Sequence, residues 1–151
     1  MGRTFIKPDQ KQRDLAVRMK LNAVPEVVAG KRIVLIDDSI VRGTTSGIIV
    51  RMLKEAGAKE VYMCVSSPAI EFPCHYGIDK SVRKELIAAT HTVEQIREYI
   101  HADKLHYLSR AGLCRAIGNI EEKDLCFACF NGDYAVQVPE DTEDGGKYVL
   151  E

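Results

Sequence analysis

Residues 33–65 constrain the fold most, because they contain two apolar strand-like runs separated by one amphipathic segment. Residues 33–36 form a continuous run rich in β-branched side chains, which predicts a strand buried on both faces of a parallel sheet. Residues 44–56 carry apolar side chains at helical spacing, and Gly57 favours a helix end there. Residues 61–65 form a second apolar run. The pattern predicts an α/β fold built on a right-handed β-α-β unit.

Shorter elements are expected around this unit. Residues 10–21 have a weak apolar stripe, which is compatible with a helix and equally with a mobile basic loop. The elements predicted further along are helices over residues 81–89 and 92–100, a strand over 104–108, and a helix over 109–117 capped by Ser109. Residues around Cys126 and Cys129 predict irregular structure.

Composition narrows the class of function. The chain has 151 residues, of which 46% are hydrophobic and 28% charged, as expected of one globular domain. Its formal net charge of -1 argues against a nucleic-acid partner. No apolar run approaches the ~20 residues that span a bilayer, and the first residues lack a signal-peptide pattern. We therefore expect a soluble, cytoplasmic protein that binds neither nucleic acid nor membranes.

The segment between the first strand and the helix has the residue types of a phosphate site. Asp37 and Asp38 follow the strand, at the edge where parallel sheets bind ligands. Gly43 permits close approach of a ligand to the backbone, and the helix that follows has an N-terminus that favours a phosphate. Two adjacent carboxylates instead suit hydroxyl groups or a divalent cation. The pattern predicts a site for a phosphorylated sugar, and the alternative is a simple capped turn.

Residues 34–46 resemble the phosphoribosyl pyrophosphate (PRPP) motif of type I phosphoribosyltransferases. Three further segments extend the resemblance to the glutamine PRPP amidotransferases (amidophosphoribosyltransferases): residues 2–6, 21–22 and 76–79. The resemblance implies a partial type I phosphoribosyltransferase fold, with flanking helices on a parallel sheet and a helical and loop-rich C-terminal appendage. It also implies a role in the first step of purine synthesis, in which an amine replaces the pyrophosphate of PRPP to give phosphoribosylamine.

The resemblance assigns roles to individual residues. Asp37 and Asp38 would hold the ribose hydroxyls and help to position Mg²⁺. Arg3 would belong to a flexible loop that closes over PRPP and neutralises the leaving pyrophosphate. The residues that would cradle the 5′-phosphate are Ser39, Ile40, Val41, Arg42, Gly43, Thr44, Thr45 and Ser46. The implied partners are PRPP, purine nucleotides as feedback inhibitors, and further copies of the chain in a homo-oligomer.

Five cysteines in a chain without a secretory context argue against a disulfide framework. Cys126 and Cys129 form a Cys-x2-Cys pair, which is compatible with zinc, an iron–sulfur cluster or a redox disulfide. The resemblance links this pair and Cys74 to the branch of the family that carries a 4Fe–4S cluster, whose fourth ligand has no counterpart here. A zinc site completed by His75 ranks below a cluster. Two other cysteines are expected in the core: Cys64 and Cys114.

The resemblance covers only part of the family's length. A glutaminase domain and the first strands of the phosphoribosyltransferase domain have no counterpart, so we expect this piece to be inactive alone or dependent on ammonia. We expect residues 1–66 and 67–138 to form two parts of one phosphoribosyltransferase domain, the second with the cysteine-bearing appendage, and 139–151 an acidic tail. A sheet that lacks strands exposes an edge and an apolar face. Two other functions stay open: a stand-alone PRPP- or nucleotide-binding regulatory module, and a nucleobase phosphoribosyltransferase.

Overall fold

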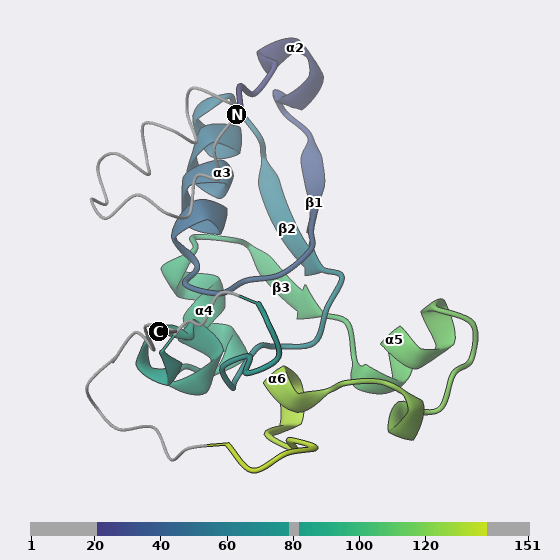
Figure 1. Cartoon of the computed structure of the whole chain (residues 1–151). Coiled ribbons are helices and arrows are strands. Elements are labelled where there is room, and N and C mark those ends of the chain that lie inside the picture. The colour runs from purple at the N-terminus through teal and green to yellow at the C-terminus, as the bar shows by residue number, and fades with distance from the viewer. Residues whose placement is uncertain (1–20, 79–81, 139–151) are drawn as a thin grey trace.

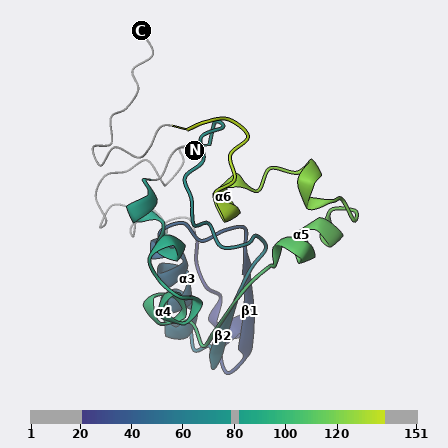
Figure 2. The same cartoon turned by 90° about the horizontal axis from the view of Figure 1, so that it is seen from below.

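The computed structural model describes residues 21–78 and 82–138. Its centre is a parallel sheet with the strand order β1-β2-β3, formed by β1 (Arg32–Asp37), β2 (Glu60–Val65) and β3 (Lys104–Tyr107). Helices α3 (Thr44–Glu55) and α4 (Val93–Tyr99) lie on the same side of this sheet (Figure 1, Figure 2). The structure therefore confirms the predicted α/β class and the β-α-β unit.

Smaller elements complete the described chain. They are α2 (Pro25–Val28), the 3-10 turns η2 (Arg83–Glu85) and η3 (Ile87–Ala89), α5 (Arg110–Ala116), the 3-10 turn η4 (Glu122–Asp124) and α6 (Ala128–Asn131). Figure 1 shows α5 and α6 beyond the carboxyl ends of the strands, whereas α2 lies near their amino ends. This arrangement places the C-terminal appendage at the same end of the sheet as the loop that follows β1.

Most of the predicted elements are confirmed with small changes at their ends. The predicted helix over 92–100 is α4, which Thr92 begins with a capping box, and Ser109 caps α5 by accepting a bond from the Gly112 N–H. The predicted helix over 81–89 is wrong, because Leu86 has an extended backbone that separates η2 from η3. The short helix α6 was not predicted. The expectation for residues 10–21 lies outside the described residues.

The core lies between the sheet and the two helices α3 and α4. Its buried side chains come from both strands and helices: Ile40, Val50, Val61, Met63, Val65, Ile87, Ile96, Ile100 and Ala102. Among the expected core thiols, Cys114 is buried and Cys64 is half-buried on the opposite face of the sheet. The core thus fixes one face of the sheet against its helices.

The other face of β1 is exposed. Val34 and Ile36 are 60% and 72% exposed, because successive side chains of a strand point to opposite faces and α3 and α4 cover one of them. The prediction of a strand buried on both faces is therefore wrong for the described chain, and the predicted exposed apolar face is confirmed. No helix among the described residues is long and apolar enough to cross a membrane.

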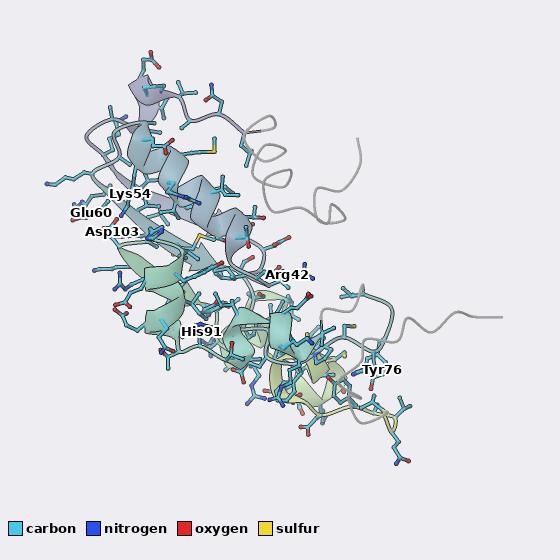
Figure 3. The ribbon with its side chains drawn as sticks, turned by 90° about the vertical axis from the view of Figure 1, so that its left-hand side faces the viewer. Arg42, Lys54, Glu60, Tyr76, His91 and Asp103 are labelled. Atoms are coloured by element: carbon cyan, nitrogen blue, oxygen red, sulfur yellow. The ribbon has the colours of Figure 1, made fainter. Side chains whose placement is uncertain are left out.

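Asp103 fixes the amino end of β3 beside β2. Its carboxylate accepts a bond of 2.7 Å from the Val61 N–H and lies 3.3 Å from Lys54 Nζ, while its own N–H donates to Val61 O at 2.9 Å. The Val61 N–H bond is the main reason that the pKa of Asp103 falls below its usual value. Figure 3 shows Lys54 and Asp103 together at one end of the molecule, far from Tyr76 at the other.

Candidate phosphate-binding site

The loop between β1 and α3 crosses the carboxyl end of the sheet and leads directly into the helix N-terminus (Figure 1). Gly43 is the N-cap residue, with a φ of 73°, and no side chain caps the helix. The first bond of the helical pattern runs from the Gly47 N–H to Gly43 O at 2.9 Å. The N–H groups of Thr44, Thr45 and Ser46 consequently have no partner within the helix, and they are available to an anion.

Residues of η3 and α4 pack against this loop. The Ile87 N–H donates to Val41 O at 2.9 Å, and Ile40 is only 2% exposed. A Cβ atom at Gly43 would lie 3.1 Å from Ile87 Cδ1 and equally close to the Tyr99 ring. The loop backbone therefore rests on η3 and α4, which leaves its other side for a ligand.

The two carboxylates at the end of β1 have different surroundings. Asp37 is half-buried and Asp38 is exposed. The Asp38 N–H donates to Asp37 Oδ1 at 3.0 Å, and the Ser39 hydroxyl donates to Asp38 Oδ1 at 3.0 Å. Burial raises the pKa of Asp37 above its usual value; the Asp38 N–H bond opposes this, and the Asp38 charge adds to it. A cation or hydroxyl donors at this position would stabilise the ionised pair.

The three cysteines that the sequence analysis singled out come from two segments that pack together. The N–H groups of Glu71 and Phe72 donate to Cys129 O at 3.0 and 3.1 Å. Burial raises the pKa of the Cys129 thiol, and the neighbouring thiols Cys74 and Cys126 raise it further. The thiols therefore lie close enough to interact, a proximity that their spacing along the chain could not predict.

The three thiols do not form a closed site for one ion. Four thiolates around one zinc ion lie about 3.8 Å apart, given Zn–S bonds of ~2.3 Å. Within residues 21–78 and 82–138, no three His, Cys, Asp or Glu side chains are arranged to hold a metal ion. Cys126 is exposed and the other two cysteines are half-buried, and all three thiols are free. The three sulfur donors are soft ligands, and one of them, that of Cys126, belongs to an exposed residue.

Comparison with known proteins identifies the family. No protein-family model matches the chain. The chain is 54% identical over 145 residues to the amidophosphoribosyltransferase of Bacillus subtilis, covering 94% of itself and 30% of that enzyme. It is 54% identical over 138 residues to the amidophosphoribosyltransferase of Methanocaldococcus jannaschii, covering 91% of itself and 29% of that enzyme. The chain belongs to the amidophosphoribosyltransferase family.

Solved structures agree with this assignment. The chain matches glutamine PRPP amidotransferase from B. subtilis complexed with ADP and GMP, with a TM-score of 0.77 and 55% identity over 93% of this chain and 31% of the other. A second match, described as the allosteric regulatory enzyme of purine biosynthesis, has a TM-score of 0.77 and 54% identity over 94% and 31%. The chain thus spans about 30% of the length of the amidophosphoribosyltransferases that it matches.

The structure brings most of the predicted site residues together. Those between Asp37 and Ser46 lie in one continuous strand, loop and helix start. Arg3 lies outside the described residues. Sequence reasoning missed Glu85, Ile87 and Tyr99, which contact the loop from positions more than forty residues away. No local pattern in the sequence could have identified them.

Tyr107 lies in the row of residues that ends the sheet near the loop. The strand register pairs Asp37 with Val65 and Val65 with Tyr107. Burial raises the pKa of Tyr107 to about 12, and no described residue is a hydrogen-bond partner of its hydroxyl. The folded state therefore favours the neutral phenol at the carboxyl end of β3.

This burial predicts a loss of stability in alkali. An unfolded tyrosine ionises near pH 10, whereas folded Tyr107 stays protonated until about pH 12, so the unfolded chain binds fewer protons in that window. We expect the free energy of unfolding to fall by about 1–2 kcal/mol between those pH values, allowing for partial solvent screening. Urea unfolding at pH 9 and 11.5 measures it. The Tyr107→Phe variant should lack this part of the decrease. If its free energy of unfolding fell with pH as steeply as that of the wild-type chain, Tyr107 would not be the cause.

Proposed function

We propose that this chain supplies the PRPP-binding part of an amidophosphoribosyltransferase. The reaction replaces the pyrophosphate of PRPP with an amine derived from glutamine and yields 5-phosphoribosylamine, glutamate and pyrophosphate, the first committed step of purine synthesis. The observation that carries the proposal is the β1–α3 loop, which combines two carboxylates with an uncapped helix N-terminus at the carboxyl end of a parallel sheet. The family relationship supports the same substrate.

Each part of the loop then has a task. The N–H groups and hydroxyls between Ser39 and Ser46 bind the 5′-phosphate, which the helix dipole also attracts. Asp37 and Asp38 accept hydrogen bonds from the ribose hydroxyls. The pair of carboxylates fits Mg²⁺, because this ion prefers hard oxygen ligands and its charge would offset the burial that raises the pKa of Asp37. When bound, Mg²⁺ would neutralise charge on the pyrophosphate.

Catalysis in this account consists of positioning and charge neutralisation. The loop fixes the ribose while ammonia approaches its anomeric carbon, so no side chain has to act as an acid or base for the displacement. Arg3 and its basic neighbours are proposed to close over PRPP and to stabilise the departing pyrophosphate. The proposed division of the chain places the PRPP motif in residues 1–66 and the three candidate cluster cysteines in 67–138. Both tasks therefore belong to the first part.

We further propose that Cys74, Cys126 and Cys129 hold three corners of a 4Fe–4S cluster. Thiolates are the ligands that such clusters use, and a cluster holds its thiolates farther apart than a single ion does. The proximity of three free thiols supports this proposal, and a fourth ligand would come from outside the described residues. Bound in this way, the cluster would cross-link the appendage to the loop that carries Cys74.

Purine nucleotides are the proposed regulators. The relative from B. subtilis was solved with ADP and GMP, and a second relative is described as an allosteric regulatory enzyme. A purine nucleotide carries a ribose 5′-phosphate like PRPP, so the same loop can accept it. The exposed side chains of Val34 and Ile36 favour further association, in keeping with a proposed homo-oligomer.

Turnover assays separate this proposal from its alternatives. We expect the chain alone to release no pyrophosphate from PRPP with glutamine, and at most a slow release with ammonia. Release that depends on a purine or pyrimidine base would instead indicate a nucleobase phosphoribosyltransferase. Binding of AMP or GMP without binding of PRPP would indicate a regulatory module.

The ion pair between Arg42 and Glu85 yields a further prediction. It joins the loop to η2, and both side chains are about 40% exposed, so its contribution to stability is small. The Glu85 carboxylate also offsets the positive charge of Arg42 beside the phosphate site. Glu85→Gln should therefore lower the free energy of unfolding by less than about 1 kcal/mol, and it should raise the affinity for PRPP about two- to fivefold at low salt.

A matched variant controls for the loss of one carboxylate. Glu121 pairs with Lys123 within the appendage, away from the loop, and Glu121→Gln should leave PRPP affinity unchanged. Titration at two salt concentrations measures both variants. A lower PRPP affinity in Glu85→Gln would show that the ion pair mainly holds the loop in shape.

A further inference from the structure

We propose that Tyr76 and Tyr134 form a clamp that holds Cys74 against the segment of Cys126 and Cys129 before any metal binds. This inference rests on the proposed cluster site and deepens it, because it names the residues of this chain that assemble the site. Both tyrosines are positioning residues, since neither has a thiol or carboxylate that would bind iron. The clamp is defined here as the two tyrosines and the backbone groups that they contact.

The two tyrosine hydroxyls form crossed hydrogen bonds. The Tyr134 hydroxyl donates to Pro73 O at 2.7 Å, and the Ala135 N–H donates to Tyr76 Oη at 2.7 Å. Each bond joins residues about sixty positions apart, and each tyrosine reaches the backbone of the other segment. The pair therefore closes the two segments on each other at the residues that flank Cys74.

The tyrosine rings strengthen the same contact. The His75 ring meets the Tyr134 ring edge-on with their centroids 4.9 Å apart, and the Tyr76 and Tyr134 rings lie 6.1 Å apart. On the other side of Cys74, a Cβ atom at Gly132 would lie 2.9 Å from the Phe72 ring. The segment that carries Cys74 is thus held on both sides by the segment that carries Cys129.

The clamp also fixes the sulfur atom itself. The Tyr76 N–H donates to Cys74 Sγ at 3.4 Å, a bond that orients the thiol. Hydrogen bonds of this kind around ligand sulfurs set the affinity and potential of iron–sulfur sites. Tyr76 therefore acts on Cys74 through its N–H and on the facing segment through its hydroxyl.

The test uses the complete 151-residue chain and three conservative variants. Tyr76→Phe and Tyr134→Phe each remove one hydroxyl and keep the ring. Tyr62→Phe is the matched control, because the Tyr62 hydroxyl donates to Glu60 at 2.6 Å on the sheet, and Figure 3 shows Glu60 and Tyr76 far apart. Far-UV circular dichroism and the thermal midpoint verify that each variant is folded.

The first readout needs no metal. Mass spectrometry follows the alkylation of each cysteine by iodoacetamide, with the exposed Cys126 as an internal reference. A net hydrogen bond changes a local opening equilibrium by roughly threefold to tenfold. We expect either clamp variant to raise the alkylation rate of Cys74 by that factor relative to Cys126, and the control to change it by less than about twofold. Equal Cys74 rates in all four proteins would overturn the proposal.

The second readout tests the cluster. After anaerobic reconstitution with ferrous iron and sulfide, a chelator is added and the loss of visible absorbance is timed. The clamp variants should bleach several-fold faster than the wild-type chain and the Tyr62→Phe control. Wild-type protein that stays free of iron after reconstitution would contradict only the cluster proposal, because the alkylation rates would still decide whether the clamp exists. Unchanged bleaching in the presence of bound iron would contradict the clamp's role in retention.

Discussion

Replacement of Gly43 with alanine is expected to disrupt PRPP binding and to destabilise the fold at the same time. Its φ of 73° lies in the left-handed region, which costs an alanine roughly 1–2 kcal/mol. The added Cβ would also lie 3.1 Å from side-chain atoms of Ile87 and Tyr99, so the loop or these two side chains have to shift by a few tenths of an ångström. We expect at least a tenfold loss of PRPP affinity, and a fall of about 2 kcal/mol in the free energy of unfolding.

Gly30 provides the matched control. Its φ of 72° is nearly the same, but nothing lies within 4 Å of the position that a Cβ atom would occupy. Gly30→Ala should therefore show the backbone cost alone and leave ligand affinity intact. Urea unfolding and calorimetric titration measure both variants. Equal losses of affinity in the two would mean that contact of the loop with Ile87 and Tyr99 has no bearing on binding.

The acidic pair gives the second large prediction, because stability and binding should respond in opposite directions. The raised pKa of Asp37 means that folding disfavours its ionised form. The native state then binds more protons than the unfolded state near and above the usual pKa of 3.8, so this group lowers stability as pH rises through that window. At pH 7, Asp37→Asn should leave stability unchanged or raise it. The same variant should lower Mg²⁺-dependent PRPP affinity at least tenfold, with a larger loss when Asp38 is also replaced.

Asp103 supplies the opposite case in the same chain. Its pKa is lowered, mainly by the Val61 N–H, so it contributes stability that is lost as pH falls below the usual pKa of 3.8. Asp103→Asn should therefore destabilise the fold and leave PRPP affinity unchanged. A carboxylate kept at a cost to stability is typical of functional sites. If Asp37→Asn destabilised the fold and bound PRPP normally, Asp37 would be a structural residue like Asp103.

Local patterns were sufficient to predict the β1–α3 loop. The β-branched run, the two acids, the left-handed glycine and the hydroxyl residues are all adjacent, so their order along the chain fixes their order in space. The helix cap at Ser109 could also be predicted from the sequence, and the Ser109 side chain accepts a hydrogen bond from the Gly112 N–H. In these regions the structure adds geometry to a motif that the sequence already contains.

The contacts that support the site from distant parts of the chain could not be predicted from local patterns. Arg42 and Glu85 are 43 residues apart, and the crossed tyrosine bonds join residues 61 and 59 apart. The predicted helix over 81–89 failed for the same reason, since the Ile87 N–H bonds to Val41 O in the loop. The prediction that β1 is buried on both faces was wrong because burial depends on what covers a strand, and the residues of the strand do not specify this.

Calorimetric titration of the 151-residue chain with PRPP in the presence of Mg²⁺ tests the central claim most directly. We expect saturable binding with one ligand per chain, weaker without Mg²⁺, and abolished when Asp37 and Asp38 are both replaced by asparagine. AMP and GMP should compete with PRPP for the same site. The absence of any binding heat at millimolar PRPP from folded wild-type protein would contradict the assignment of the β1–α3 loop as a PRPP site.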